Sequence, residues 1–179
     1  IEQQILEWFN HFHTHAEISW KEVETTKKLA SILDDLGVEY RLFGDVTGLV
    51  AEIGEGEECV AVRADIDALW QEVNGEWQAN HSCGHDANMA MVLGALLRLK
   101  DEPLQHRVRF IFQPAEEMGN GAVAAFERGA VDGVSHLFGV HLRPIDEIPF
   151  GKVTPAMHHG AAYFLTGTIQ GVDAHGARP

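Results

Sequence analysis

A cysteine and a histidine lie two residues apart in this sequence, at Cys83 and His85, with a glycine between them. On a turn, a thiol and an imidazole at this spacing can reach one small volume, and both groups bind transition metals. Two adjacent carboxylates follow at Glu116 and Glu117, and another imidazole follows at His141. These residue types predict a metal site built for hydrolysis, with further ligands and a proton acceptor.

The two glutamates are expected to perform different tasks. Neighbouring side chains on an extended backbone point apart, so both are not expected to be simple ligands of one metal site. We interpret Glu117 as a metal ligand and Glu116 as the general base that takes a proton from water. For an isolated pair, a solvated position at the start of a helix is the alternative. The apolar strand and the Gln-Pro that precede this pair favour the catalytic interpretation.

A structural zinc site is a second alternative. Structural zinc is usually enclosed by Cys and His ligands in closely spaced pairs, whereas the donors here are mixed and contain no CxxC pair. His11, His13 and His15 alternate along a predicted helix, and we interpret them as surface residues rather than ligands.

Apolar residues indicate the elements that must position these groups. They repeat with helical spacing in four segments and form short runs typical of strands in four others. The predicted helices cover residues 1–14, 20–36, 89–99 and 121–129. The predicted strands cover residues 48–53, 59–64, 108–112 and 137–140. Because strands alternate with helices, we predict an α/β fold with a largely parallel sheet flanked by helices. The polar segment 54–58 is interpreted as a solvated turn of the hairpin type.

The polar residues of interest follow predicted strands. Asp65 and Asp67 come after the second strand, Glu116 and Glu117 after the third, and His141 ends the fourth. Open α/β sheets form their ligand crevice at the carboxyl ends of the strands. We therefore expect these side chains to meet in one crevice.

Charge and composition restrict the classes of partner. The chain has 179 residues, a formal net charge of -14, 45% hydrophobic residues and 22% charged residues. This is the composition of a globular domain, and its negative charge disfavours nucleic acid and anionic membranes as partners.

Cysteine usage and apolar runs bear on the compartment. Two cysteines are too few for a disulfide framework, and Cys59, inside an apolar run, is interpreted as a buried structural thiol. No apolar run reaches the length of a membrane-spanning helix, and the first residues form no signal peptide. We predict a soluble, cytoplasmic protein.

The pattern changes near the end of the sequence. A strand is predicted over residues 162–171, followed by a loop that contains His175. We divide the chain into residues 1–156, the N-terminal part of a catalytic domain, and residues 157–179, the beginning of a second domain. The chain starts without Met and stops where no element is complete, so we predict a fragment of a longer protein.

Taken together, these motifs resemble the aminoacylase and carboxypeptidase family of dinuclear metallohydrolases, metallopeptidase family twenty. The resemblance is to its amidohydrolase branch, which contains hydrolases of hippurate, N-acyl amino acids and auxin conjugates. It rests on residues 63–69, 81–87, 110–117, 139–141 and 171–179, in the order of the family. It implies a zinc-exopeptidase-like catalytic domain followed by an α+β lid or dimerisation domain.

The resemblance also implies roles for the candidate residues. Cys83, His85, Glu117 and His141 would hold two divalent transition-metal ions, such as zinc, manganese, cobalt or nickel. Glu116 would be the base, and the attacking nucleophile would be metal-activated water.

Two further residues receive roles from the resemblance alone. Asp65 would be a supporting carboxylate that fixes a metal-bound group. His175 matches a histidine of the lid domain that, in dimeric relatives, reaches the active site of the neighbouring subunit and stabilises the oxyanion of the transition state. The implied partners are therefore a small amide substrate and a second copy of the chain, in a homodimer formed through the lid domain.

The implied reaction is hydrolysis of the amide bond of N-acyl amino acids or similar small amides. Two alternatives stay open: a noncatalytic metal-binding or interaction domain, if the chain ends at residue 179, and a related dipeptidase or deacetylase. Trp70 replaces a common Pro and Asn88 replaces a common His, changes expected to reshape the substrate pocket. The last metal ligand of the family, a histidine near the end of longer chains, has no counterpart.

Overall fold

A computed structural model describes residues 1–156, 165–168 and 170–177 of the chain. The chain divides into two compact units, Ile1–Leu142 and Arg143–Pro179. Part of the strand predicted over residues 162–171 lies outside the described residues, and residues 165–168 form neither helix nor strand. The boundary after residue 156 stays a prediction.

Each of the four predicted helical segments contains a helix. They are α1 (Glu2–Thr14), α2 (Val23–Leu36), α3 (His85–Leu99) and α4 (Gly121–Glu127). The second helix ends as predicted at Gly37, whose φ of 67° is the left-handed conformation that glycine adopts readily. The third begins four residues before its predicted start, so that His85 belongs to its first turn.

Five strands form the sheet of the first unit, in the order β1-β2-β6-β3-β7. They are β1 (Tyr40–Leu42), β2 (Leu49–Ile53), β3 (Cys59–Asp65), β6 (Arg107–Gln113) and β7 (Val134–Gly139). β3 pairs in parallel with β6 and with β7, whereas β2 is antiparallel to both of its neighbours. β2 therefore runs against the other four strands. The predicted α/β fold with a largely parallel sheet and flanking helices is confirmed.

The turn at 54–58 is exposed, as predicted, but it is not a hairpin. It leads from β2 to β3, and these two strands do not pair because β6 lies between them. A local sequence pattern cannot reveal a strand that is inserted from far along the chain.

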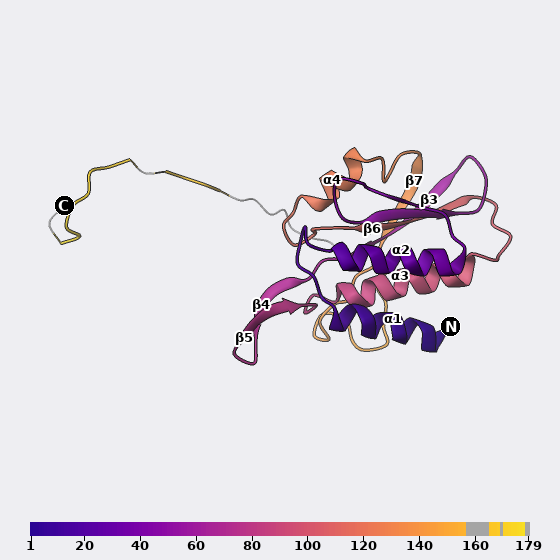
Figure 1. Ribbon diagram of the computed structural model, residues 1–179, viewed down its shortest axis with the longest axis horizontal. Helices are drawn as coiled ribbons and strands as arrows, with labels where there is room; N and C mark the ends of the chain where they lie inside the picture. The colour runs from indigo at the N-terminus through magenta and orange to yellow at the C-terminus, as the bar shows by residue number, and fades with distance from the viewer. Residues whose placement is uncertain (157–164, 169, 178–179) are drawn as a thin grey trace. The chain divides into compact units, whose positions relative to one another are not determined.

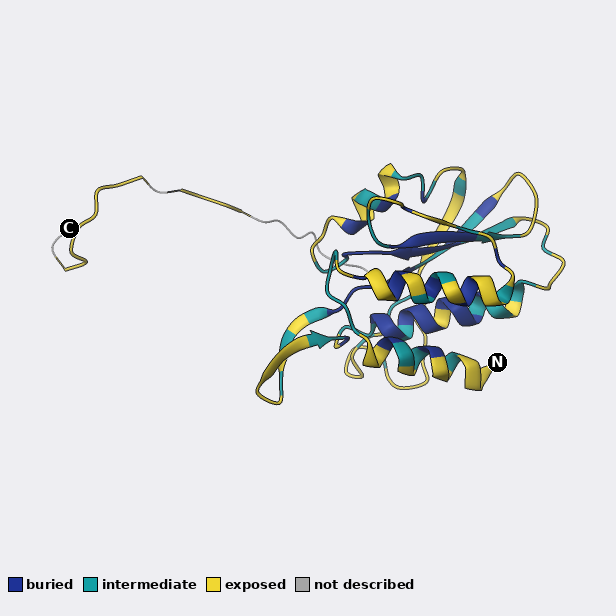
Figure 2. Cartoon of the chain, in the orientation of Figure 1, coloured by how far each residue is buried: buried dark blue, intermediate teal, exposed yellow. Residues whose placement is uncertain are grey.

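Helices cover both faces of the sheet. The helices α1, α2 and α3 lie on one face and α4 lies on the other (Figure 1). Along β6, Phe110 and Phe112 pack into the larger core with α1, α2 and α3, while Ile111 packs into the smaller core with Ala125 of α4. This alternation is the period of a strand with two covered faces, and the buried residues concentrate in the sheet and in the helix faces turned toward it (Figure 2).

A separate hairpin, not predicted above, joins β3 to α3. Its strands are β4 (Leu69–Val73) and β5 (Glu76–Asn80). Asn74 and Gly75 connect them with positive φ angles of 54° and 87°, the conformation that tight two-residue hairpin turns require. The Asn-Gly pair was the sequence signal for this turn.

Cys59 is fully buried and free, in agreement with the interpretation of a structural thiol. Among the described residues, none of the helices has the length and apolar character needed to cross a membrane.

A carboxylate and two guanidinium groups link β2 to β6. Glu52 accepts hydrogen bonds from Arg107 Nη1 at 3.0 Å and from Arg109 Nε at 2.8 Å. Partial burial tends to raise the pKa of Glu52, but these two arginines outweigh it and hold the pKa below its ordinary value.

We therefore expect Glu52→Gln to lower the free energy of unfolding by about 1 kcal/mol at about pH 7. A lowered pKa stabilises the fold above the ordinary pKa of glutamate, and this contribution disappears as the pH falls through the lowered value. The difference between the two proteins should therefore be smaller at about pH 3 than at about pH 7. Urea unfolding at both pH values measures it, with Glu55→Gln in the exposed turn as the control. An equal difference at both pH values would contradict the expectation.

Candidate metal centre

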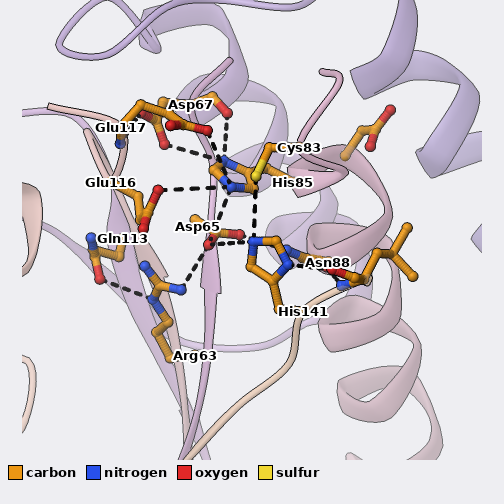
Figure 3. Close-up of polar contacts among 12 residues, drawn as sticks. Arg63, Asp65, Asp67, Cys83, His85, Asn88, Gln113, Glu116, Glu117 and His141 are labelled. Atoms are coloured by element: carbon orange, nitrogen blue, oxygen red, sulfur yellow. Dashed lines mark hydrogen bonds and ion pairs between the residues drawn. The ribbon is translucent and has the colours of Figure 1, made fainter. Parts of the chain in front are cut away.

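His85 is the buried centre of the predicted site. It is the first residue of α3, and its Nδ1 lies 2.8 Å from the carbonyl oxygen of Asp67. Because a carbonyl only accepts, Nδ1 carries the proton and Nε2 is left with a free lone pair. Within the described part of the chain, Nε2 is buried without a hydrogen-bond partner and is directed toward the ends of the strands (Figure 3).

His141 and Cys83 complete a first group of donors. His141 follows β7, and its Nδ1 lies 2.6 Å from the carbonyl oxygen of Leu142, which again leaves Nε2 free. That Nε2 lies 3.6 Å from the Sγ atom of Cys83. The donor atoms of Cys83, His85 and His141 all lie within 4.8 Å of one another.

Carboxylates from two strand ends form a second group. Donor atoms of Asp65, His85 and Glu116 also lie within 4.8 Å of one another. Asp65 Oδ2 lies 3.4 Å from Nε2 of His85 and 3.9 Å from Nε2 of His141. The Oε1 atom of Glu117 lies 3.8 Å from Nε2 of His85. Within the described residues, this Oε1 is buried without a hydrogen-bond partner.

Asp65 is held by its neighbours on both oxygens. Arg63 Nη1 donates to Oδ2 at 2.7 Å, and Asn88 Nδ2 donates to Oδ1 at 2.8 Å. Arg63 also donates to Gln113 Oε1, while Asn88 Oδ1 accepts the amide of Leu142 beside His141. The orientation of Asp65 is thereby fixed from β3, β6 and α3 at once.

Asp67, which was expected in the crevice but given no role there, contacts two parts of the site. Its Oδ2 accepts hydrogen bonds from Ser19 Oγ at 2.6 Å and from the amide of Glu117 at 3.0 Å. Burial tends to raise its pKa, but the adjacent imidazole of His85 and hydrogen bonds from Ser19 and the Glu117 amide lower it below the ordinary value. Asp67 thus ties His85, through its carbonyl oxygen, to the glutamate turn, through its carboxylate. The Asp-x-Asp spacing after β3 was the signal for it.

The electrostatics of the site favour a bound cation. Burial, followed by the charges of Glu117 and Glu116, raises the pKa of the Cys83 thiol to about 12. Burial and Glu116 also raise the pKa of Glu117. Burial opposes protonation of His85, but Asp67 and Asp65 outweigh it and raise the pKa of this imidazole. Negative charge is therefore in excess here, and the mixed sulfur, nitrogen and oxygen donors suit a transition metal.

The structure brings together six of the seven residues predicted for the site. Asp65, Cys83, His85, Glu116, Glu117 and His141 all belong to the first unit and meet at one edge of its sheet (Figure 3). His175 belongs to the second unit, where it is exposed, and its role stays a prediction.

An α/β sheet with such a donor set at its strand ends defines a metallohydrolase-type catalytic domain. The model of the peptidase family M20/M25/M40 matches residues 61–163, and the chain belongs to this family. This finding confirms the resemblance inferred from the motifs.

Solved and curated relatives agree with this assignment. A dinuclear metal-binding peptidase of the M20 family from Bacillus subtilis superposes with a TM-score of 0.74 and 38% identity, over 79% of this chain and 43% of the relative. An IAA-amino acid hydrolase of Arabidopsis thaliana (ILR1-like 4) is 38% identical over 93% of this chain and 40% of its own length. An N-acetyl-L-cysteine deacetylase of Bacillus subtilis is 37% identical over 100% of this chain and 46% of its own length. The chain spans less than half of each relative.

The contacts of Asn88 generate a prediction. Asn88→Ala removes the donor to Asp65 and the acceptor for the Leu142 amide, so both neighbouring groups lose their orientation. We expect the affinity for a divalent transition metal to fall by about 10- to 100-fold. Competition with a metal-binding indicator measures it. Ser82→Ala, which removes a hydrogen bond to the hairpin instead, is the control. Unchanged affinity in a folded Asn88→Ala protein would contradict the expectation.

Proposed function

We propose that this protein is a metal-dependent amidohydrolase that cleaves the amide bond of N-acyl amino acids or similar small amides. One observation carries the proposal. Two buried ligand atoms, Nε2 of His85 and Oε1 of Glu117, have no hydrogen-bond partner among the described residues and lie 3.8 Å apart. Buried polar atoms are normally satisfied, and a metal ion satisfies both of these at once.

The substrate class is supported by what two relatives have in common. The plant relative is named for IAA-amino acids and the bacterial relative for N-acetylcysteine. Both compounds join an acyl group to the nitrogen of an amino acid. We propose the same type of bond as the substrate of this protein.

We propose two divalent transition-metal ions, chosen from zinc, manganese, cobalt and nickel. Cys83, His85, Glu117 and His141 would hold them, and Asp65 lies within 3.9 Å of Nε2 of both imidazoles. When bound, the ions supply Lewis-acid polarisation of the amide carbonyl and lower the pKa of water.

The two glutamates would divide the remaining work. The side chain of Glu116 is 41% exposed, whereas that of Glu117 is 22% exposed, and their carboxylates lie 4.0 and 3.8 Å from Nε2 of His85. Glu116 is therefore the one open to a substrate. It accepts the proton of the attacking water and returns it to the leaving amine. Asp65 is kept in place by Arg63 and Asn88.

We propose that His175 donates a hydrogen bond to the oxyanion of the transition state in a neighbouring subunit. This role requires a homodimer formed through the second domain. A cytoplasmic location is likewise a prediction from the sequence, supported by two free cysteines.

The first test concerns the base. Glu116→Gln should lower kcat for N-acetyl amino acids by about 100- to 10,000-fold, because an amide cannot accept the proton. Its metal content should stay at that of the unchanged protein. Amine release and elemental analysis measure the two quantities. Glu117→Gln is the matched comparison, in which metal content and activity should fall together. Full activity in Glu116→Gln would show that another group is the base.

The second test concerns the thiolate. Dialysis against a chelator should abolish hydrolysis, and a divalent transition metal should restore it. Cys83→Ser should bind fewer metal ions than the unchanged protein, because a hydroxyl is a poorer ligand than a thiolate. Cys59→Ser makes the same chemical change in the core and should keep its metal. Equal metal content in all three proteins would remove Cys83 from the ligand set.

A further inference from the structure

Glu22 is a fully buried carboxylate that the proposed mechanism does not use. It precedes α2 and has no exposed surface. Its Oε1 accepts the backbone amide of Ala115 at 2.8 Å, and its Oε2 accepts the hydroxyl of Thr47 at 2.7 Å. Burying a carboxylate is costly unless its hydrogen bonds offset the lost hydration. The groups that donate hydrogen bonds to Glu22 therefore indicate the role of this side chain.

The more informative of these contacts is the one to Ala115. This residue is fully buried, immediately precedes Glu116 and has a φ of +46°. A left-handed conformation is unfavourable for a residue with a Cβ and persists only where its surroundings impose it. The hydrogen bond from the Ala115 amide to Glu22 is such a constraint.

Glu116 thus lies between two backbone amides that are each held by a buried carboxylate. Glu22 accepts the amide of Ala115, and Asp67 accepts the amide of Glu117 at 3.0 Å. The turn is also packed tightly, because a Cβ on Gly121 would overlap with the carbonyl oxygen of Pro114. A small shift of this backbone would move both glutamate side chains relative to His85.

We propose that Glu22 is a positioning residue, which holds the Ala115 amide and thereby keeps the carboxylates of Glu116 and Glu117 aimed at the metal site. This inference rests on the proposed function for its effect on hydrolysis. Its structural part, the restraint of the turn, can be tested without any substrate.

Three variants separate positioning from general stability. Glu22→Met fills the same space but offers no acceptor to the Ala115 amide. Glu22→Gln keeps a carbonyl oxygen for that amide, and its NH₂ group can donate to Thr47. Leu29→Ala makes a cavity beneath α2, the helix that Glu22 precedes. Leu29 is a fully buried residue of the larger core within this helix. Leu29→Ala should therefore lower the stability as Glu22→Met does, without removing the hydrogen bond between Glu22 and the Ala115 amide.

The experiment uses the intact protein in its metal-free and metal-loaded forms. Amide hydrogen exchange of the segment 113–121, affinity for zinc, and kcat and KM for an N-acetyl amino acid are measured, together with the melting temperature. For Glu22→Met we expect faster exchange at Ala115, weaker zinc binding and a kcat lower by about 10- to 100-fold, with KM nearly unchanged. Glu22→Gln should restore all three quantities toward those of the unchanged protein. Leu29→Ala should lower the melting temperature alone.

Other results would overturn the proposal. If Glu22→Met keeps slow exchange at Ala115, normal zinc affinity and normal kcat, Glu22 does not position the turn. The same conclusion follows if Leu29→Ala, at an equal loss of melting temperature, changes these quantities as much as Glu22→Met does. If the unchanged protein hydrolyses no amide, the proposed function fails, while exchange and zinc affinity still decide whether Glu22 holds the turn.

Discussion

The hydrogen bond between Nδ1 of His85 and the carbonyl oxygen of Asp67 is the constraint on which the site depends. It joins the end of β3 to the first turn of α3 and determines which nitrogen of the imidazole faces the crevice. The carboxylate of the same aspartate accepts the amide of Glu117, so that one residue orients a nitrogen donor and an oxygen donor together. Loss of this alignment would rotate the central ligand of the site away from the others.

A second level of support comes from the segment between α1 and α2. Ser19 donates to Asp67, and Glu22 accepts the amide of Ala115, so this short segment reaches both carboxylate-bearing strand ends. The N-terminal helices therefore do more than cover one face of the sheet. The segment that joins them supplies polar contacts that fix the backbone near His85 and Glu116, which explains why buried polar side chains occur beside an otherwise apolar core.

The class of fold and the location of the site could both be predicted from the sequence, because both depend on where the buried strands lie. Apolar runs reveal buried strands, and the residues after Asp65 and before Glu116 show where those strands end. The partners of the ligands could not be predicted in the same way. Asn88 lies on α3 and Glu22 just before α2, and each contacts a residue in another part of the chain, Asp65 and Ala115 respectively. The contact to Ala115 depends on the place of β6, which ends just before this residue and lies between β2 and β3 in the sheet, and no local pattern encodes that placement.

The balance of charge explains why this support must be extensive. Carboxylates of Asp65, Glu116 and Glu117 converge on one imidazole, and burial further disfavours the negative charge of Glu117. Without a cation, such a cluster repels itself, and flexible side chains would move apart into solvent. The hydrogen bonds from Arg63 and Asn88 keep Asp65 in place against that repulsion, and the bond from the Glu117 amide keeps Asp67 in place. A site held in this way keeps its ligands oriented before a metal ion arrives, so that less of the binding free energy is spent on ordering them.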